Sequence, residues 1–166
     1  MNDDQVNTYY LYDGANVIAD TDGTGVIKSY YLRGPSGNLI STETEGKQYY
    51  YATDGLGSTT GITDETGAII SKYQYDEFGN ISFEQSNIRN PFKFTGAIHD
   101  KTANLYLMGS RYYNPEVGRF ITQDSYGATF GADWTEHLYS YGNNNPVNML
   151  DPTGHIGYCG EGLFML

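Results

Sequence analysis

The sequence of 166 residues contains a single cysteine, Cys159, which has no partner for an internal disulfide. One thiol also cannot build the cysteine clusters that hold structural metal ions. The three histidines, His99, His137 and His155, are scattered along the chain without the spacing of a metal-binding motif. We therefore expect the chain to use neither a metal nor any other cofactor.

Long hydrophobic runs are missing as well. No segment approaches the ~20 apolar residues that a membrane-spanning helix needs. Residues 1–20 also lack the apolar stretch of a secretory signal peptide. We expect a soluble piece that does not insert into a membrane. The compartment stays open, and the fragment by itself could be cytoplasmic.

Basic side chains are few. Nine Lys and Arg stand against 20 Asp and Glu, which gives a net charge of −11 and a pI near 4.4. Affinity for nucleic acids depends largely on basic side chains that neutralise phosphates, so a nucleic-acid partner is not expected. Attraction to an anionic membrane surface is disfavoured for the same reason. Charged residues make up only 17% of the chain, which also argues against a helical bundle.

Glycine and tyrosine, by contrast, are abundant. The chain has 21 glycines and 17 tyrosines, and aromatic residues make up 15% of it. Disordered segments are poor in aromatic residues, so disorder is excluded. Glycine combined with tyrosine, threonine and isoleucine is typical of short strands joined by tight turns. The composition predicts an all-β fold.

One phrase recurs in the first two thirds of the chain, namely an aromatic cluster followed by a turn that contains glycine. Its copies are YYLYDG at 9–14, YYLRG at 30–34, YYYATDG at 49–55 and YQYDEFGN at 73–80. The last tyrosines of successive clusters are 19, 20 and 24 residues apart. About 20 residues accommodate two strands of ~5–6 residues and two turns, so each copy predicts one β-hairpin.

The segments between the clusters carry turn signals. Residues 21–25 read TDGTG and residues 63–67 read TDETG. The pair Asp22-Gly23 predicts a type I′ hairpin turn, because aspartate and glycine tolerate the positive φ angles that this turn needs. Within the clusters, alternation places Tyr73 and Tyr75 on the same face of a strand.

Stacked hairpins of this kind predict a curled antiparallel sheet with aromatic residues on one face. Its open edges invite pairing with another chain, so self-association through the sheet edges is an expected property. About four hairpins are too few for a closed shell, which indicates a fragment or a capped end of something larger. The tyrosines either pack this sheet or stack on a glycan, and we favour packing.

The texture of the sequence changes after Gly96. Residues 97–155 lose the repeat, and they gain asparagine, proline and the sole tryptophan. A short helix is expected at 134–141, with Asp133 as its N-cap. The tail that follows, residues 156–166, has neither the repeat of the first segment nor the composition of the second. We predict a hairpin array at 1–96, a capping segment at 97–155 and a variable tail at 156–166.

These features resemble the YD repeats and the Rhs repeat-associated core of bacterial polymorphic toxins. The plainest YD copy is Tyr75-Asp76 with Gly79-Asn80. Three motifs resemble the core, namely GSRYYNPEVGRFITQD at 109–124, LYSYGNNNPV at 138–147 and DPTGH at 151–155. Their wording is most similar to wall-associated, WapA-like members. The resemblance implies a secreted or cell-wall-associated parent protein that takes part in bacterial competition.

The resemblance also implies an activity. In that family, YD repeats wind into a hollow β-shell around a C-terminal toxin, and the core plugs the shell and cuts the chain as an aspartyl autopeptidase. Here the cut would fall between His155 and Ile156, with Asp124 and Asp151 as the two acids. Two carboxylates held together cannot both ionise easily, so one keeps a proton to donate while the other polarises the attacking water. Arg119 is expected to hold one carboxylate ionised or to support the developing oxyanion.

The implied partners are the rest of the shell and the C-terminal toxin of the parent protein. An alternative stays open at the level of the residues, because aspartate before serine or proline is also ordinary turn chemistry. The chain would then be a non-catalytic surface or carbohydrate-binding module, with a glycan as its partner.

Overall fold

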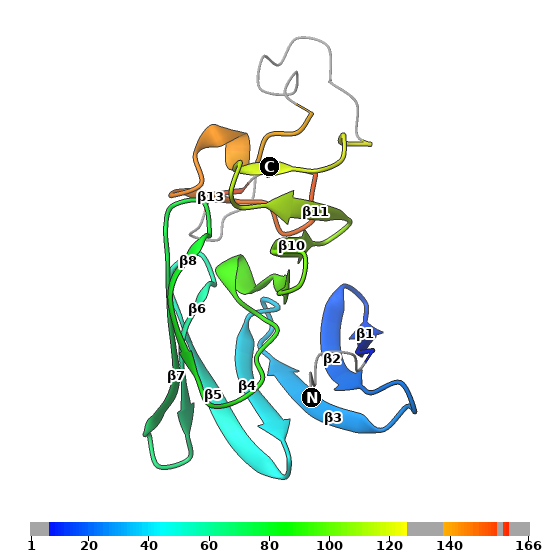
Figure 1. Cartoon of the computed structure of the whole chain (residues 1–166), viewed down its shortest axis with the longest axis vertical. Helices are drawn as coiled ribbons and strands as arrows, with labels where there is room; N and C mark the ends of the chain where they lie inside the picture. Colours follow the sequence, from blue (N-terminus) through cyan, green and yellow to red (C-terminus); the bar gives the residue numbers. More distant parts are fainter. Residues whose placement is uncertain (1–6, 126–137, 156–157, 160–166) are drawn as a thin grey trace.

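The chain folds into β-structure wherever it is described (Figure 1). The structure, a computed structural model, describes residues 7–125, 138–155 and 158–159. Within those ranges the helical elements are two 3-10 turns, η1 (Phe94–Gly96) and η3 (Gly142–Asn144), and there is no α-helix. The all-β prediction is confirmed. The helix expected at 134–141 lies largely outside the described residues, and its last four positions form turn, bridge and bend structure.

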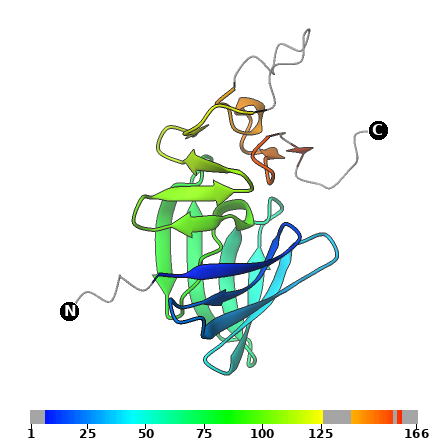
Figure 2. The same ribbon diagram turned by 90° about the vertical axis from the view of Figure 1, so that its right-hand side faces the viewer.

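An eight-stranded antiparallel sheet makes up the first half of the molecule. Its strands are β1 (Tyr9–Asp13), β2 (Asn16–Thr21), β3 (Ile27–Arg33), β4 (Leu39–Thr44), β5 (Lys47–Thr53), β6 (Thr59–Asp64), β7 (Ile69–Tyr75) and β8 (Ile81–Ser86). Each strand pairs with the next one along the chain, so β1 and β8 are the two edges. Figures 1 and 2 show that the sheet curls on itself, as predicted from the stacked hairpins.

The two faces of this sheet differ in burial. The inner face carries buried tyrosines, among them Tyr31 and Tyr73, alternating along the sheet with small buried residues such as Ser29, Ser41 and Ser71. Tyr30, one position from Tyr31, is 52% exposed on the outer face. The period-two alternation therefore separates a packed face from an exposed one, as it should in a strand. Glycan binding by the exposed tyrosines stays a prediction.

Four of the hairpin turns are built by an Asp-x-x-Gly unit. In each, the aspartate side chain accepts the backbone N–H groups two and four residues ahead, and the glycine has a positive φ. This arrangement occurs at Asp22–Gly25, Asp54–Gly57, Asp64–Gly67 and Asp76–Gly79. The type I′ turn predicted at Asp22-Gly23 is wrong. Positive φ lies at Gly25 instead, because the Asp22 side chain closes a longer loop.

These capped turns predict acid sensitivity. Hydrogen bonds, chiefly from the Thr24 and Thr66 side chains, hold the pKa of Asp22 and Asp64 below the ordinary value of 3.8. A carboxyl whose pKa is depressed by folding stabilises the fold above its unfolded pKa, and that contribution disappears as pH falls through the folded pKa. We expect urea midpoints to drop below about pH 4. In the double variant Asp22→Asn, Asp64→Asn the drop should be shallower, and an unchanged slope would assign the acid sensitivity to other groups.

Residues 87–96, named here the crossing segment, run across the concave face of the sheet. Phe92 packs edge-on against Tyr31, with the ring centroids 4.8 Å apart. Lys93, buried beneath the sheet, lies 3.7 Å above the ring of Tyr73 and forms an ion pair of 2.8 Å with Glu84. Arg89 forms an ion pair with Asp20, which is fully buried. One segment thus ties together strands that lie far apart in the curl.

The turn between β7 and β8 predicts a sharp steric effect. Gly79 has a φ of 90°, and a Cβ there would lie 2.5 Å from the Phe94 ring. Gly79→Ala should therefore lower the free energy of unfolding by about 1–3 kcal/mol. Gly67→Ala is the matched control, because Gly67 holds the same turn position with a φ of 83° and a Cβ there meets nothing within 4 Å. Urea unfolding measures both, and equal effects would show that the Phe94 contact does not constrain the turn.

A second antiparallel sheet begins just after the crossing segment. It contains β9 (Ile98–Asp100), β10 (Leu105–Met108), β11 (Arg111–Asn114) and β12 (Arg119–Phe120), and Met149–Leu150 (β13) pairs with Tyr158–Cys159 (β14). Its buried core consists of Phe94, Tyr106, Met108, Tyr113, Phe120 and Tyr141. The hydroxyls of Tyr106 and Tyr113 donate to the Gly79 and Phe78 carbonyls, each at 2.8 Å. These hydrogen bonds fix the second sheet to the first. The division of the chain into residues 1–96, 97–155 and 156–166 stays a prediction.

Candidate active site

Three separate stretches of chain meet at the far end of the second sheet. Arg111 opens β11, Asp124 follows β12, and Asp151 follows β13. The carbonyl of Leu138 connects two of them, since it accepts the Asp124 N–H and the Arg111 Nη1–H, both at 3.0 Å. The motifs at 109–124, 138–147 and 151–155 therefore converge on one place.

Arg111 lies between the two aspartates. Its Nη2 atom is 3.0 Å from Asp124 Oδ2 and 3.6 Å from Asp151 Oδ2. The exposed fractions of the three side chains are 5% for Arg111, 9% for Asp124 and 3% for Asp151. Because one nitrogen contacts both carboxylates, the two acids are neighbours in a sheltered cluster. The guanidinium carbon of Arg111 also lies over the Phe120 ring, 3.7 Å from the ring centroid.

Two glycines make this convergence sterically feasible. A Cβ on Gly109 would lie 2.3 Å from the Thr153 carbonyl oxygen, and a Cβ on Gly154 would lie 2.6 Å from the Met108 carbonyl oxygen. Both contacts involve backbone, which cannot move aside cheaply. The two glycines thus let the tip of the β10–β11 hairpin touch the 151–155 segment, and Ser110 N–H donates to the Thr153 carbonyl at 3.2 Å.

His155 completes the cluster. Its backbone N–H donates to Asp151 Oδ1 at 2.9 Å, and its ring Nδ1 lies 2.7 Å from Asp124 Oδ1. The other ring nitrogen, Nε2, lies 2.9 Å from Ser110 Oγ. Both predicted acids therefore hold the residue that precedes the predicted cut.

Burial dominates the electrostatics of the cluster. Burial raises the pKa of Asp151, although the His155 N–H and the Arg111 charge act in the opposite direction. Burial also lowers the pKa of Arg111, against the pull of Asp124 and Asp151. Burial thus favours the protonated form of the Asp151 carboxyl. The cluster can thus offer one proton donor beside one charged carboxylate.

The structure brings most of the predicted site residues together. Asp124, Asp151 and His155 are in contact. Arg119 instead lies exposed on β12, and its backbone forms an isolated antiparallel β-bridge with Ser140. Ile156 lies outside the described residues. Sequence reasoning did not select Arg111 or Ser110 for the site. The available signal for Arg111 was its spacing of two from Tyr113, which places both on the buried face of β11.

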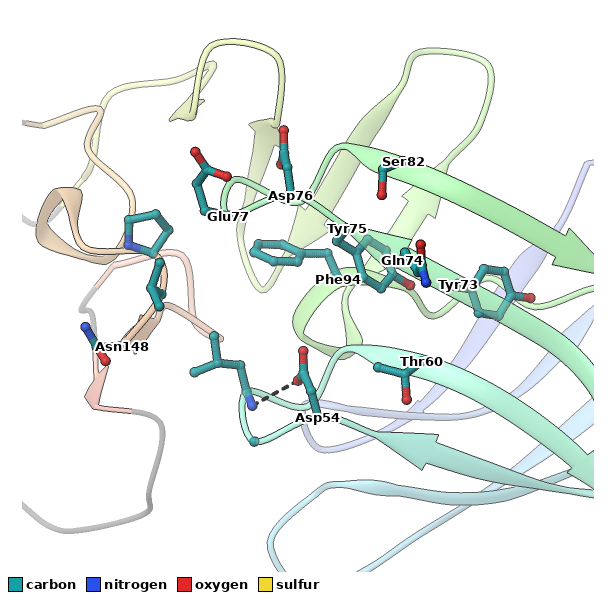
Figure 3. A pocket seen from close by; sticks show the side chains of 14 residues that line it. Asp54, Thr60, Tyr73, Gln74, Tyr75, Asp76, Glu77, Ser82, Phe94 and Asn148 are labelled. Carbon is teal, nitrogen blue, oxygen red and sulfur yellow. Dashed lines mark hydrogen bonds between the residues drawn. The ribbon is translucent and has the colours of Figure 1, made fainter.

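A separate groove of about 1130 Å³ lies where the β5–β6 and β7–β8 turns approach residues 146–148 (Figure 3). Tyr73, Tyr75 and Phe94 line it together with the acidic residues Asp54, Asp76 and Glu77. The carboxylates of Asp54 and Asp76 already accept backbone N–H groups of their own turns. The groove therefore has carboxylates committed to turn structure rather than a second reactive cluster.

The described residues contain no group of three or more His, Cys, Asp or Glu side chains that could hold a metal ion. Among them, too, no helix has the length and apolar character needed to cross a membrane.

Comparison with known proteins identifies the family of this fold. The family model of the teneurin YD-shell matches residues 22–147. The chain is 37% identical over 153 residues to the tRNA nuclease WapA of Bacillus subtilis strain 168, covering 89% of this chain and 7% of that protein. It is 33% identical over 112 residues to the toxin protein Tse5 of Pseudomonas aeruginosa, covering 68% of this chain and 8% of that protein.

A crystal structure of TcdB2–TccC3–Cdc42 shares the fold, with a TM-score of 0.67 and 23% identity over 82% of this chain and 7% of that one. The chain spans less than a tenth of the length of each of these proteins. The family match, the all-β curl and the sequential hairpins agree with one another. The chain belongs to the teneurin YD-shell family, and it is a YD-repeat domain related to those of WapA and of the toxin protein Tse5.

Proposed function

We propose that this chain closes one end of a YD-repeat shell and cuts itself between His155 and Ile156 with Asp124 and Asp151. The observation that carries the proposal is that both carboxylates hold residue 155. Asp151 accepts its backbone N–H, and Asp124 contacts its ring. Two buried acids beside the peptide link that they are to break constitute the geometry that acid–base hydrolysis needs.

The two acids have different tasks in this proposal. Asp151, whose pKa is raised by burial, keeps a proton and donates it to the carbonyl oxygen of His155. Asp124, paired with Arg111, is the charged carboxylate that polarises the water. Asp124 accepts a proton from the water as the water oxygen bonds to the carbonyl carbon. When the C–N bond to Ile156 breaks, Asp124 gives that proton to the leaving nitrogen, and the protonated carbonyl oxygen returns its proton to Asp151. One water is consumed, and a carboxyl and an amine result.

Arg111 takes the role that the sequence suggested for Arg119. It contacts both carboxylates, whereas Arg119 is exposed on the second sheet. A guanidinium in a sheltered site stabilises a charge far better than one in water does. We infer that Arg111 keeps Asp124 ionised while the proton resides on Asp151.

Intact-mass measurement of the 166-residue chain tests the proposal. The wild-type chain should lose residues 156–166 with time, and Asp124→Asn and Asp151→Asn should stay whole, because an amide neither donates a carboxyl proton nor carries the charge. Asp13→Asn, an exposed change on β1, is the matched control and should cut at the wild-type rate. A wild-type chain that keeps its full mass would refute self-cleavage, and cutting in both site variants would assign it to other residues.

The remaining parts of the proposal concern the parent protein. The relatives are many times longer than this chain and include a nuclease and a toxin. We infer that the open edges β1 and β8 continue into further shell strands and that cargo follows the cut site. A secreted or wall-associated parent is part of the same proposal. Cleavage would then separate cargo from shell without unfolding either.

A further inference from the structure

The imidazole of His155 has an oxygen partner at each ring nitrogen. Nδ1 lies 2.7 Å from Asp124 Oδ1, and Nε2 lies 2.9 Å from Ser110 Oγ. The side chain is 19% exposed. An ionised carboxylate only accepts hydrogen bonds, so the Nδ1 atom beside Asp124 carries the hydrogen.

Backbone contacts hold Ser110 in place. It lies at the tip of the β10–β11 hairpin, and its N–H donates to the Thr153 carbonyl at 3.2 Å. Its Oγ lies 3.2 Å from the same carbonyl. The contact at Gly109 fixes this tip against the 151–155 segment. The hydroxyl therefore faces the His155 ring from a rigid position.

The hydroxyl suits the ring in either protonation state. Beside a neutral imidazole, Ser110 donates to Nε2. Beside an imidazolium, Nε2–H donates to Ser110, and the hydroxyl turns its hydrogen to the Thr153 carbonyl. Both arrangements use only contacts that the structure contains. A leucine or any other apolar side chain at 155 would satisfy neither Asp124 nor Ser110.

We infer that Ser110 is a specificity-determining residue, which together with Asp124 makes the site selective for histidine immediately before the cut. This inference rests on the proposed self-cleavage for its functional consequence. Ser110 acts as a positioning residue, because it holds the side chain of the residue whose carbonyl is attacked. The selectivity belongs to residue 155, and the acids remain Asp124 and Asp151.

A double-mutant cycle tests the inference. The rate at which fragment 1–155 forms is measured for the wild type, Ser110→Ala, His155→Leu and the double variant. A single hydrogen bond is worth about 0.5–1.5 kcal/mol, so Ser110→Ala should slow the histidine chain about two- to tenfold. In the His155→Leu background the same change should have no effect. Ser36→Ala, at an exposed turn position, is the matched serine control.

A second readout separates this inference from the proposed function. Nitrogen-15 NMR of the imidazoles reports the Nε2 environment whether or not the chain cuts. Ser110→Ala should move the Nε2 resonance of His155 and leave that of His99 unchanged. Equal slowing in both backgrounds, or an unmoved Nε2 resonance, would overturn the inference. If no chain cuts but the resonance moves, self-cleavage fails while recognition of the imidazole stands.

Discussion

Replacing Arg111 with methionine is expected to lower the free energy of unfolding by about 3–5 kcal/mol, since removal of one partner from a buried ion cluster leaves the others uncompensated. Arg111 is 5% exposed, and its guanidinium separates two carboxylates that are themselves 9% and 3% exposed. Methionine matches the length of the stem and keeps contact with Phe120, so the lost charge, not a cavity, dominates the effect. Self-cleavage should stop as well.

The pH dependence of the free energy of unfolding shows why the Arg111→Met variant is less stable. Without the guanidinium a buried carboxylate charge is left uncompensated, so the deficit should shrink as pH falls and the carboxyl groups of the cluster take up protons. Urea unfolding of wild type and variant across the acidic range measures this. A deficit that is the same at every pH would mean that lost packing on Phe120, rather than charge, explains the change.

Arg119→Met is the matched control for stability. Arg119 is exposed on β12, and exposed substitutions usually change the free energy of unfolding by less than about 0.5 kcal/mol. The pair of variants therefore decides which arginine the site uses. A stable Arg119→Met chain that stays whole would return the charge-stabilising role to Arg119. A stable chain that cuts would leave that role with Arg111.

Local patterns accounted for the sheet. Alternation such as Lys72-Tyr73-Gln74-Tyr75 depends only on the two-residue period of a strand, so the packed face was predictable. Turn geometry was less so. The pair Asp22-Gly23 satisfies the residue preference of a type I′ turn, but the longer Asp22–Gly25 loop gains two side-chain hydrogen bonds to backbone N–H groups. The two turn types differ little in free energy, and the residue preferences alone do not decide which of them forms.

The crossing segment lay beyond sequence reasoning. Residues 87–96 show no period of two, and their partners are distant along the chain, as in the pair Arg89 and Asp20. Contacts of this kind depend on the curl of the whole sheet, which is a global property. A hydrophobic pair such as Phe92 and Phe94 predicts burial without predicting where.

The candidate site shows the same division. Resemblance to the Rhs core predicted that Asp124, Asp151 and residue 155 belong together, and they are in contact. The arginine that joins the acids was not predicted, because the choice between Arg111 and Arg119 depends on strand register. Arg111 pairs with Met108 across the hairpin and shares the buried face with Tyr113. Sequence motifs identify which segments converge, and register decides which side chains meet.

The second large effect is expected from Phe92→Ala, which should lower the free energy of unfolding by about 3–5 kcal/mol. Phe92 is 1% exposed, and its ring fills the concave face between Val17, Tyr31 and Leu39. Arg33 lies over the ring, 4.9 Å from its centroid. Removing the ring leaves a cavity that these neighbours, fixed by strand pairing, cannot fill.

Phe83→Ala on β8 is the matched control, because Phe83 is 42% exposed and its loss creates no cavity. Urea unfolding of both variants measures the difference, which should be several-fold. Because this ring packs against β2, β3 and β4 together, the Phe92 variant should also lose cooperativity, with the N-terminal hairpins opening first in hydrogen exchange. Uniform exchange across all eight strands would show instead that hydrogen-bonded pairing alone holds the curl. The crossing segment would then pack on the sheet without stabilising its curl.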